Sequence, residues 1–276
     1  MSRALTLFAC GLISAGAAAQ EGAPPGQPAT IEEAIERSLE EIPAETVFFE
    51  ASDGVKIAGL YRAPAALDVP RPAVLMLHGG NQRKEYYWFS GLVETLLDDG
   101  YHLLSIDIRG RGESEGGDIE ALRQNPTLAH RDLVAALGWL RARDGVDADR
   151  IAVIGASYGG NLITSWMRMH DEPVRTIVTV SATAISFRFP ELYPGAELHN
   201  IKSSGLYLAC SDELARYDAA ATAERLKTMT DGRSEVRIYE GTTHAIGVFI
   251  YHPESLAEID RWLEQELGGA PLQKGG

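Results

Sequence analysis

Two serines in this sequence lie in a pattern that can expose a nucleophile. The segments "GASYGG" (155–160) and "GESEGG" (112–117) both fit G-x-S-x-G. A serine hydroxyl attacks an acyl carbon efficiently only when a base removes its proton and nearby donors stabilise the oxyanion that forms. The first question is therefore whether Ser157 or Ser114 has surroundings that allow this chemistry.

The surroundings favour Ser157 as the nucleophile. It directly follows the apolar run "RIAVIG" and precedes the helical pattern "YGGNLITSWMRMH". A strand, a tight turn bounded by small residues and a helix form the context that an exposed nucleophile requires. Ser114 instead lies between Glu113 and Glu115, whose charges would oppose an oxyanion, and a loop rather than a helix follows it.

The base and the acid that orients it are predicted after later strands. His244 lies in "YEGTTHAIGV", between the last predicted strand and the C-terminal helix, and His252 at a helix start is the second choice. Asp212 directly follows the predicted strand "GLYLAC" and is the preferred acid. Glu213 and Asp218 are weaker candidates because they lie further into the helix expected next. An acid is needed to hold the imidazole in one tautomer and to stabilise its charged form.

These residues require a fold that brings the ends of several strands together. Two β-rich runs, "ETVFFEA" and "VKIAGLYRA", predict an antiparallel hairpin. The runs that follow alternate with helical patterns; they are "AVLMLHG", "HLLSIDI", "RIAVIGA", "TIVTVSA", "GLYLACS" and "EVRIYEG". This order predicts an α/β fold, with a mostly parallel twisted sheet of about eight strands and helices on both faces. Ligands bind beyond the carboxyl ends of the strands in such sheets, where the candidate residues lie.

At this point the sequence resembles the α/β-hydrolase family. The resemblance rests on five segments in the family's order: "LHGG" (77–80), "DIRGRGES" (107–114), "GASYGG" (155–160), "SDE" (211–213) and "TTHAIG" (242–247). It is strongest to the esterase, lysophospholipase-like and prolyl-oligopeptidase-like branches. It implies an oxyanion hole made by the backbone N–H groups of Tyr158 and Gly80, with Asn81 in place of Gly80 if the loop register differs. In the family the "DIRGRGES" loop shapes the site, which implies a structural role for Ser114.

The residues and the resemblance together predict a serine hydrolase. It would cleave small-molecule carboxylic esters through an acyl-enzyme intermediate, with a Ser-His-Asp triad and without a cofactor or metal. A serine peptidase or amidase of the same fold and a non-catalytic binding protein on this fold are the alternatives. The segment 183–202 between two predicted strands is too short for a large helical cap, so we expect a minimal cap and an open crevice.

The charge balance restricts the partners of the protein. Lys and Arg number 25 against 39 Asp and Glu, which gives a formal net charge of −14. Binding of nucleic acid requires a basic surface that neutralises phosphates, so a nucleic-acid partner is not expected. Stable association with an anionic membrane is not expected for the same reason. The composition does not determine the oligomeric state.

The N-terminal segment has the layout of a secretory signal. It carries one cation, Arg3, then an apolar stretch, then three alanines that end at residue 19. Cleavage there would remove Cys10 and leave Cys210 alone, without an intramolecular disulfide. A lipoprotein signal around Cys10 is a weaker alternative. The chain is therefore predicted to be secreted or periplasmic, with a signal peptide (1–19), a flexible leader and short helix (20–44), a single α/β-hydrolase domain (45–268) and a tail (269–276).

Overall fold

A computed structural model describes most of the chain beyond its N-terminal segment. The described residues are 30–65, 69–117, 122, 125–171, 174–187, 198–213 and 218–268. The predicted signal peptide, most of the leader before residue 30 and the predicted tail lie outside them, as does the middle of the predicted cap segment. Within the described ranges, no helix combines the length and the apolar character that crossing a membrane requires.

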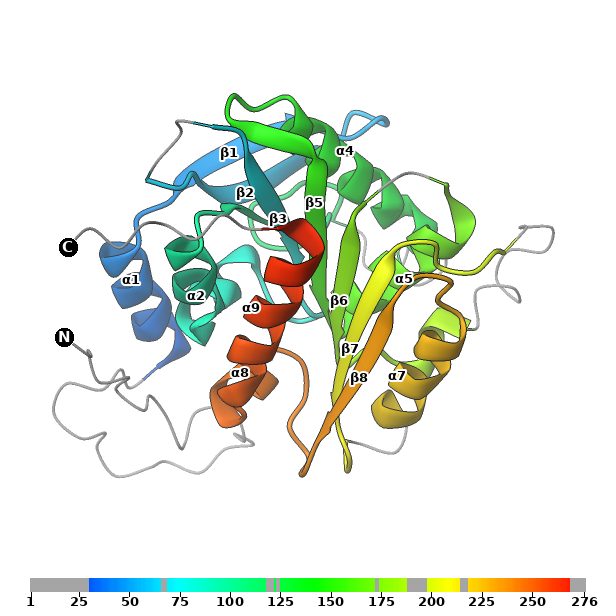
Figure 1. The fold of residues 1–276 in the computed structure, drawn as a ribbon. Coiled ribbons are helices and arrows are strands. Elements are labelled where there is room, and N and C mark those ends of the chain that lie inside the picture. The colour runs from blue at the N-terminus through cyan, green and yellow to red at the C-terminus, as the bar shows by residue number, and fades with distance from the viewer. Residues whose placement is uncertain are drawn as a thin grey trace, which may run out of the picture.

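One eight-stranded sheet organises the fold, in the order β1-β2-β4-β3-β5-β6-β7-β8 (Figure 1). Pairing is antiparallel between β1 and β2 and between β2 and β4, and parallel from β4 to β8. The predicted hairpin and the mostly parallel sheet are therefore confirmed. The strands are β1 (Glu45–Glu50), β2 (Lys56–Arg62), β3 (Arg71–Leu77), β4 (His102–Ile106), β5 (Val146–Ala156), β6 (Thr176–Val180), β7 (Ser204–Cys210) and β8 (Ser234–Tyr239).

Helices cover both faces of the sheet, as Figure 1 shows. One face is covered by α1 (Ile31–Glu41), α2 (Leu92–Asp98), α8 (Gly247–Tyr251) and α9 (Glu254–Leu267). The other is covered by α4 (His130–Arg141), α5 (Tyr158–Met169) and α7 (Ala219–Thr228). Three short 3₁₀ helices complete the described elements: η1 (Lys84–Ser90), η2 (Pro126–Ala129) and η3 (Ala184–Phe187).

Two apolar clusters form the core, one on each side of the sheet. Leu75 of β3 belongs to the cluster under α4, α5 and α7 together with Trp166. Its neighbour Met76 belongs to the cluster under α2, α8 and α9 together with Trp262. Successive side chains of a strand point to opposite faces, so a strand covered on both sides must be apolar at every position. This explains the unbroken apolar runs in the sequence.

The helical pattern after β3 is interrupted at Gly91. The sequence pattern suggests one helix over 85–100, whereas the structure forms η1, then Gly91 with φ of 83°, then α2. A left-handed residue cannot continue a right-handed helix, and glycine adopts it without a Cβ clash. The spacing of apolar residues is similar on both sides of Gly91, so the sequence pattern does not reveal the break in the helix.

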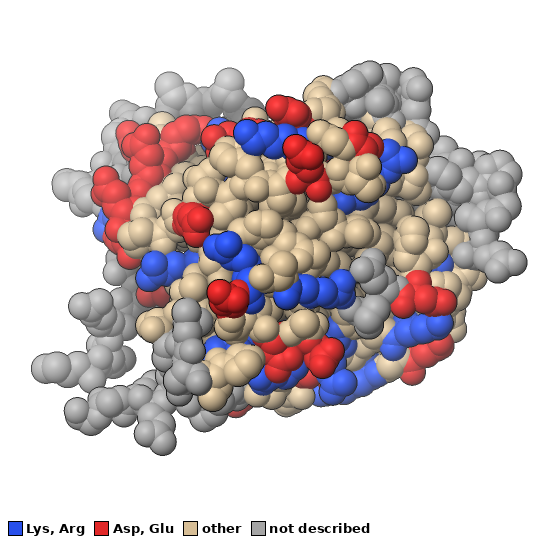
Figure 2. All heavy atoms as spheres, turned by 90° about the horizontal axis from the view of Figure 1, so that it is seen from above, with Lys and Arg blue, Asp and Glu red and all other residues tan. Residues whose placement is uncertain are grey.

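The end of the molecule where the parallel strands begin carries charges of both signs (Figure 2). Arg150 donates to Asp147 at 2.7 Å and Arg233 to Glu266 at 3.2 Å. The strand ends that carry the candidate site residues lie at the opposite end of the sheet, the lower end in Figure 1. Cys210 lies at that end of β7 and is buried, as expected for a small core residue.

Candidate active site

Ser157 lies at a strained turn between β5 and α5. Its φ of 50° and ψ of −107° fall outside the regions that most residues other than glycine adopt. Such a conformation is costly and persists only when its surroundings hold it. Its N–H donates to the Val180 carbonyl at 2.8 Å, and its own carbonyl accepts from the Asn161 N–H at 2.9 Å. The turn is therefore fixed by β6 on one side and by the first turn of α5 on the other.

Two glycines make this turn possible because the backbone packs closely around them. A Cβ on Gly159 would lie 2.1 Å from the Leu77 carbonyl oxygen, and a Cβ on Gly155 would lie 2.5 Å from the Gly159 carbonyl carbon. Both distances are far below van der Waals contact. The G-x-S-x-G spacing here thus reflects close packing of β3, β5 and α5 around the serine.

His244 lies within hydrogen-bonding distance of the candidate nucleophile. Its Nε2 is 2.8 Å from Ser157 Oγ, although 86 residues separate the two along the chain. The second choice, His252, lies elsewhere: its ring stacks on Tyr239, and its Nδ1 is 3.4 Å from Glu254 Oε1. The structure therefore brings the first predicted pair together.

The acid beside His244 is Glu213, so the prediction of Asp212 is wrong. Glu213 Oε2 bonds His244 Nδ1, and the Glu213 side chain is only 1% exposed. Asp212 is exposed and accepts a hydrogen bond from Ser211 Oγ at 2.8 Å. The expectation placed Glu213 inside a helix, but α7 begins only at Ala219 and residues 211–213 form a turn. In that turn the second carboxylate, not the first, points inward.

The hydrogen bonds determine which nitrogen of His244 carries the proton. An ionised carboxylate only accepts hydrogen bonds, so the proton between Glu213 and His244 belongs to Nδ1. Nε2 then carries a lone pair and accepts from Ser157 Oγ. This is the arrangement in which an imidazole can remove the proton of a serine hydroxyl.

Ser114 is held in the loop that follows β4. Its Oγ donates to the Asp107 carbonyl at 2.6 Å and accepts from the Ala58 N–H at 2.8 Å. These bonds tie the loop to β2 of the N-terminal hairpin. The contacts support a structural role for this serine.

The loop after β3 holds the predicted oxyanion donor in a defined orientation. The Gly79 carbonyl accepts from His78 Nδ1 at 2.7 Å and from the Gln82 N–H at 3.0 Å. In a trans peptide the N–H points away from the carbonyl, so the Gly80 N–H points away from both of these donors. On the other side, a Cβ on Gly80 would lie 3.7 Å from Tyr158 Cβ. The two predicted donors, Gly80 and Tyr158, therefore lie on adjacent backbone segments.

Two side chains below the loop maintain this geometry. His78 Nε2 accepts from the Ile108 N–H at 3.1 Å, which leaves the proton on Nδ1 for the Gly79 carbonyl. Burial lowers the pKa of His78, so the ring stays neutral and keeps this tautomer. Arg111 Nε donates to the Gly80 carbonyl at 2.6 Å. The loop is thus fixed by groups that belong to the "DIRGRGES" segment as well as by its own histidine.

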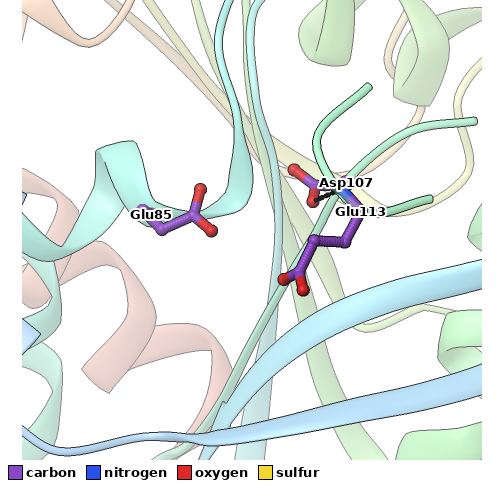
Figure 3. Close-up of side chains that lie close together, drawn as sticks. All are labelled: Glu85, Asp107 and Glu113. Carbon is purple, nitrogen blue, oxygen red and sulfur yellow. Dashed lines mark hydrogen bonds between the residues drawn. The ribbon is translucent and has the colours of Figure 1, made fainter. Parts of the chain in front are cut away.

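Three carboxylates near this loop form the one possible metal-binding group among the described residues. The carboxylates of Glu85, Asp107 and Glu113 lie within 4.8 Å of one another (Figure 3). Lys84 Nζ lies 2.7 Å from Glu85, 2.8 Å from Asp107 and 2.7 Å from Glu113. Burial opposes the charge of Lys84, but the three carboxylates raise its pKa above the ordinary value. The ammonium group therefore occupies the position that a metal ion would need.

Comparisons with known proteins agree with the fold. The model of the alpha/beta hydrolase fold family matches residues 72–201. A dipeptidyl aminopeptidase BIII from Pseudoxanthomonas mexicana is 33% identical over 95 residues, which cover 34% of this chain and 14% of that protein. The quorum-quenching protein AidA from Acinetobacter baumannii is 32% identical over 128 residues, covering 45% of this chain and 40% of that protein. The matches span less than half of either relative.

A solved structure resembles most of the described chain. The esterase Pf2001 from Pyrococcus furiosus superposes with a TM-score of 0.63 at 19% identity, covering 83% of this chain and 94% of that one. At this level of identity the similarity concerns the fold.

Proposed function

We propose that this chain, which has the α/β-hydrolase fold, acts as a serine hydrolase on small-molecule carboxylic esters. The observation that carries the proposal is the continuous line of hydrogen bonds from Ser157 through His244 to Glu213. Each member comes from a different loop at the carboxyl ends of β5, β7 and β8. Packing alone does not require a buried carboxylate, an imidazole and a strained serine to meet at one point.

The first half of the proposed reaction forms the acyl-enzyme. His244 Nε2 removes the proton of Ser157 as Oγ attacks the ester carbonyl carbon. Glu213 holds the imidazole in the required tautomer and stabilises the imidazolium that forms. The N–H groups of Gly80 and Tyr158 stabilise the oxyanion, and one such donor is typically worth about 10²–10³ in turnover.

The first half ends when the tetrahedral intermediate collapses: the bond from the acyl carbon to the alcohol oxygen breaks, His244 gives its proton to that oxygen, and the alcohol departs. In the second half, His244 removes a proton from a water molecule that attacks the acyl carbon. Collapse of this second intermediate releases the carboxylic acid and returns the proton to Ser157. Apart from the ester and one water molecule, the groups used in these steps are side chains and backbone N–H groups of the chain.

A peptidase or amidase remains the second candidate function. The similarity to a dipeptidyl aminopeptidase favours it, and the same three side chains could attack an amide. That similarity spans only 34% of this chain. Parallel assays with a simple ester and an aminoacyl p-nitroanilide measure the preference directly. A higher kcat/KM for the anilide would contradict the ester proposal.

Replacement of the two motif serines tests the nucleophile. We expect Ser157→Ala to lower kcat for a short p-nitrophenyl ester by at least about 10⁴-fold, as loss of a nucleophile does in other triads. The matched control Ser114→Ala should keep most of the activity, because it removes only two structural hydrogen bonds. A fluorophosphonate probe should label the wild-type protein and Ser114→Ala, but not Ser157→Ala.

The outcomes of this test also separate catalysis from binding. An active Ser157→Ala protein, or loss of labelling in Ser114→Ala, would overturn the assignment of the nucleophile. A folded wild-type protein that neither reacts with the probe nor turns over any ester would favour the non-catalytic alternative. Secretion to the periplasm or medium remains a prediction from residues 1–19.

A further inference from the structure

Ser181, directly after β6, has an unusual backbone conformation beside the candidate triad. Its φ is 56° and it is fully buried. Among the described residues, four positions other than glycine have positive φ. Three of them, Ser157, Ser181 and Ala245, are linked to the triad by sequence or by a hydrogen bond. Residues with strained backbone conformations tend to cluster at functional sites, where the surrounding structure holds them in place.

The Ser181 hydroxyl connects the loop of the acid to the loop of the base. It donates to Glu213 Oε1 at 2.8 Å and accepts from the Ala245 N–H at 2.9 Å. Ala245 directly follows His244 in the chain. A hydroxyl has one proton to donate, and here that proton goes to the carboxylate while a lone pair receives the backbone N–H.

These contacts divide the two oxygens of Glu213 between two tasks. Oε1 accepts from Ser181 Oγ and from the Cys210 N–H at 2.9 Å, and Oε2 bonds His244 Nδ1. With two donors on Oε1, the carboxylate cannot rotate without breaking a buried charge-assisted hydrogen bond. Without the Ser181 hydroxyl, the Cys210 N–H would be the one remaining donor to Oε1 among the described residues.

We propose that Ser181 is a positioning residue for the triad, acting through Glu213 and the Ala245 N–H. The proposal rests on the proposed function. Glutamate has one more rotatable bond than aspartate, so a catalytic glutamate needs more restraint to present one oxygen to the imidazole. Ser181 supplies that restraint, and its positive φ is the conformation that places the hydroxyl between the two loops.

A double-mutant cycle tests whether Ser181 acts through Glu213. The variants are Ser181→Ala, Glu213→Ala and the double variant, each assayed for kcat and KM with the same p-nitrophenyl ester. We expect Ser181→Ala to lower kcat by about 10- to 100-fold with little change in KM, as loss of a hydrogen bond to a charged group does. In the Glu213→Ala background, Ser181→Ala should lower kcat by less than about 3-fold, because the carboxylate that the Ser181 hydroxyl bonds is absent. Equal losses in both backgrounds would overturn the proposal.

Two further variants separate positioning from folding. Ser181→Gly suits the positive φ better than serine, so it should fold well yet lose the same activity as Ser181→Ala. Normal activity in Ser181→Gly would show that only the backbone shape matters and would overturn the proposal. Thr176→Val is the matched control in β6, the strand that ends directly before Ser181. It removes a buried hydroxyl that bonds the Ser204 carbonyl and Trp262 Nε1 at the other end of β6, and it should lower stability but not kcat.

Failure of this inference can be distinguished from failure of the proposed function. If Ser157→Ala still hydrolyses the ester, the triad mechanism itself is wrong. If Ser157→Ala is inactive while Ser181→Ala is fully active, the triad mechanism stands and the positioning role is refuted.

Discussion

The two neighbouring carboxylates at 212 and 213 have opposite surroundings. The Glu213 side chain is 1% exposed and bonds three groups: His244 Nδ1, Ser181 Oγ and the Cys210 N–H. The Asp212 side chain is exposed, and among the described residues its carboxylate accepts a hydrogen bond from the neighbouring Ser211 hydroxyl. The difference in environment, not in acid chemistry, decides which of them orients the imidazole.

Amide variants of these two residues should therefore differ widely in activity. Glu213→Gln removes the charge that stabilises the imidazolium and can favour the wrong tautomer, so we expect kcat/KM to fall by about 10³- to 10⁴-fold. Asp212→Asn should change it by less than about 3-fold. The measurement is ester hydrolysis at pH 8 on both purified variants. A larger loss in Asp212→Asn than in Glu213→Gln would restore Asp212 as the acid.

At the scale of elements, the loops after β3, β5, β6, β7 and β8 bring the site together. The backbone of α5 packs closely against the end of β3 at Gly159, where an added Cβ would lie 2.1 Å from the Leu77 carbonyl oxygen. This contact also sets the separation between the two predicted oxyanion donors. Small changes in the contact between β3 and α5 should therefore affect both the stability of the protein and its activity.

Two glycine-to-alanine substitutions test this contact. Gly159→Ala would place a Cβ 2.1 Å from a β3 carbonyl oxygen, so the backbone must shift. We expect it to lower the free energy of unfolding by at least about 1–3 kcal/mol and to reduce ester hydrolysis. Gly138→Ala, within α4, meets no atom within 4 Å and should raise the free energy of unfolding by about 0.5–1 kcal/mol. Urea titrations measure the free energy of unfolding of each variant. An equal change in this free energy for the two variants would contradict the packing argument.

At the scale of the whole molecule, the excess of acidic residues places carboxylates close together, and they repel one another where α2 meets α9. Asp99 at the end of α2 lies close to Asp260 and Glu264 of α9 and follows Asp98. Burial, a hydrogen bond with Asp260 and the surrounding negative charges together raise the pKa of Asp99 to about 7. The folded protein therefore holds this proton more tightly than the unfolded chain, whose aspartates titrate near about 3.9.

This shift predicts a pH-dependent loss of stability. The contribution of Asp99 is full at a pH below the unfolded value and declines as the pH rises through the folded value, because the folded state then loses a proton that it binds more tightly. Asp99→Asn keeps a neutral group at all pH values. We therefore expect Asp99→Asn to raise the melting temperature relative to wild type more at pH 8 than at pH 5. A constant difference between the two pH values would show that the carboxyl group titrates normally.

Much of the fold followed from local sequence patterns. Apolar runs at β spacing that alternate with helical periodicity determine an α/β sheet covered on both faces, because each side of a buried strand must be apolar. The same reasoning placed Ser157 after β5 and His244 after β8, and the structure brings the two within 2.8 Å. Their catalytic roles remain predictions until the variants are measured.

The sequence by itself determined the class of fold and the strand ends where reactive residues lie, whereas only the tertiary structure decided which side chains meet there. The structure shows that Glu213, and not the predicted Asp212, bonds His244. It also shows that the helical pattern over 85–100 is interrupted at Gly91 and that Ser181 lies between the loops of Glu213 and His244. The reason is physical: periodicity reports the burial of an element, which is a local property. The direction of one side chain in a turn depends on where the strand ends and on donors from distant segments, and those are set only when the chain has folded.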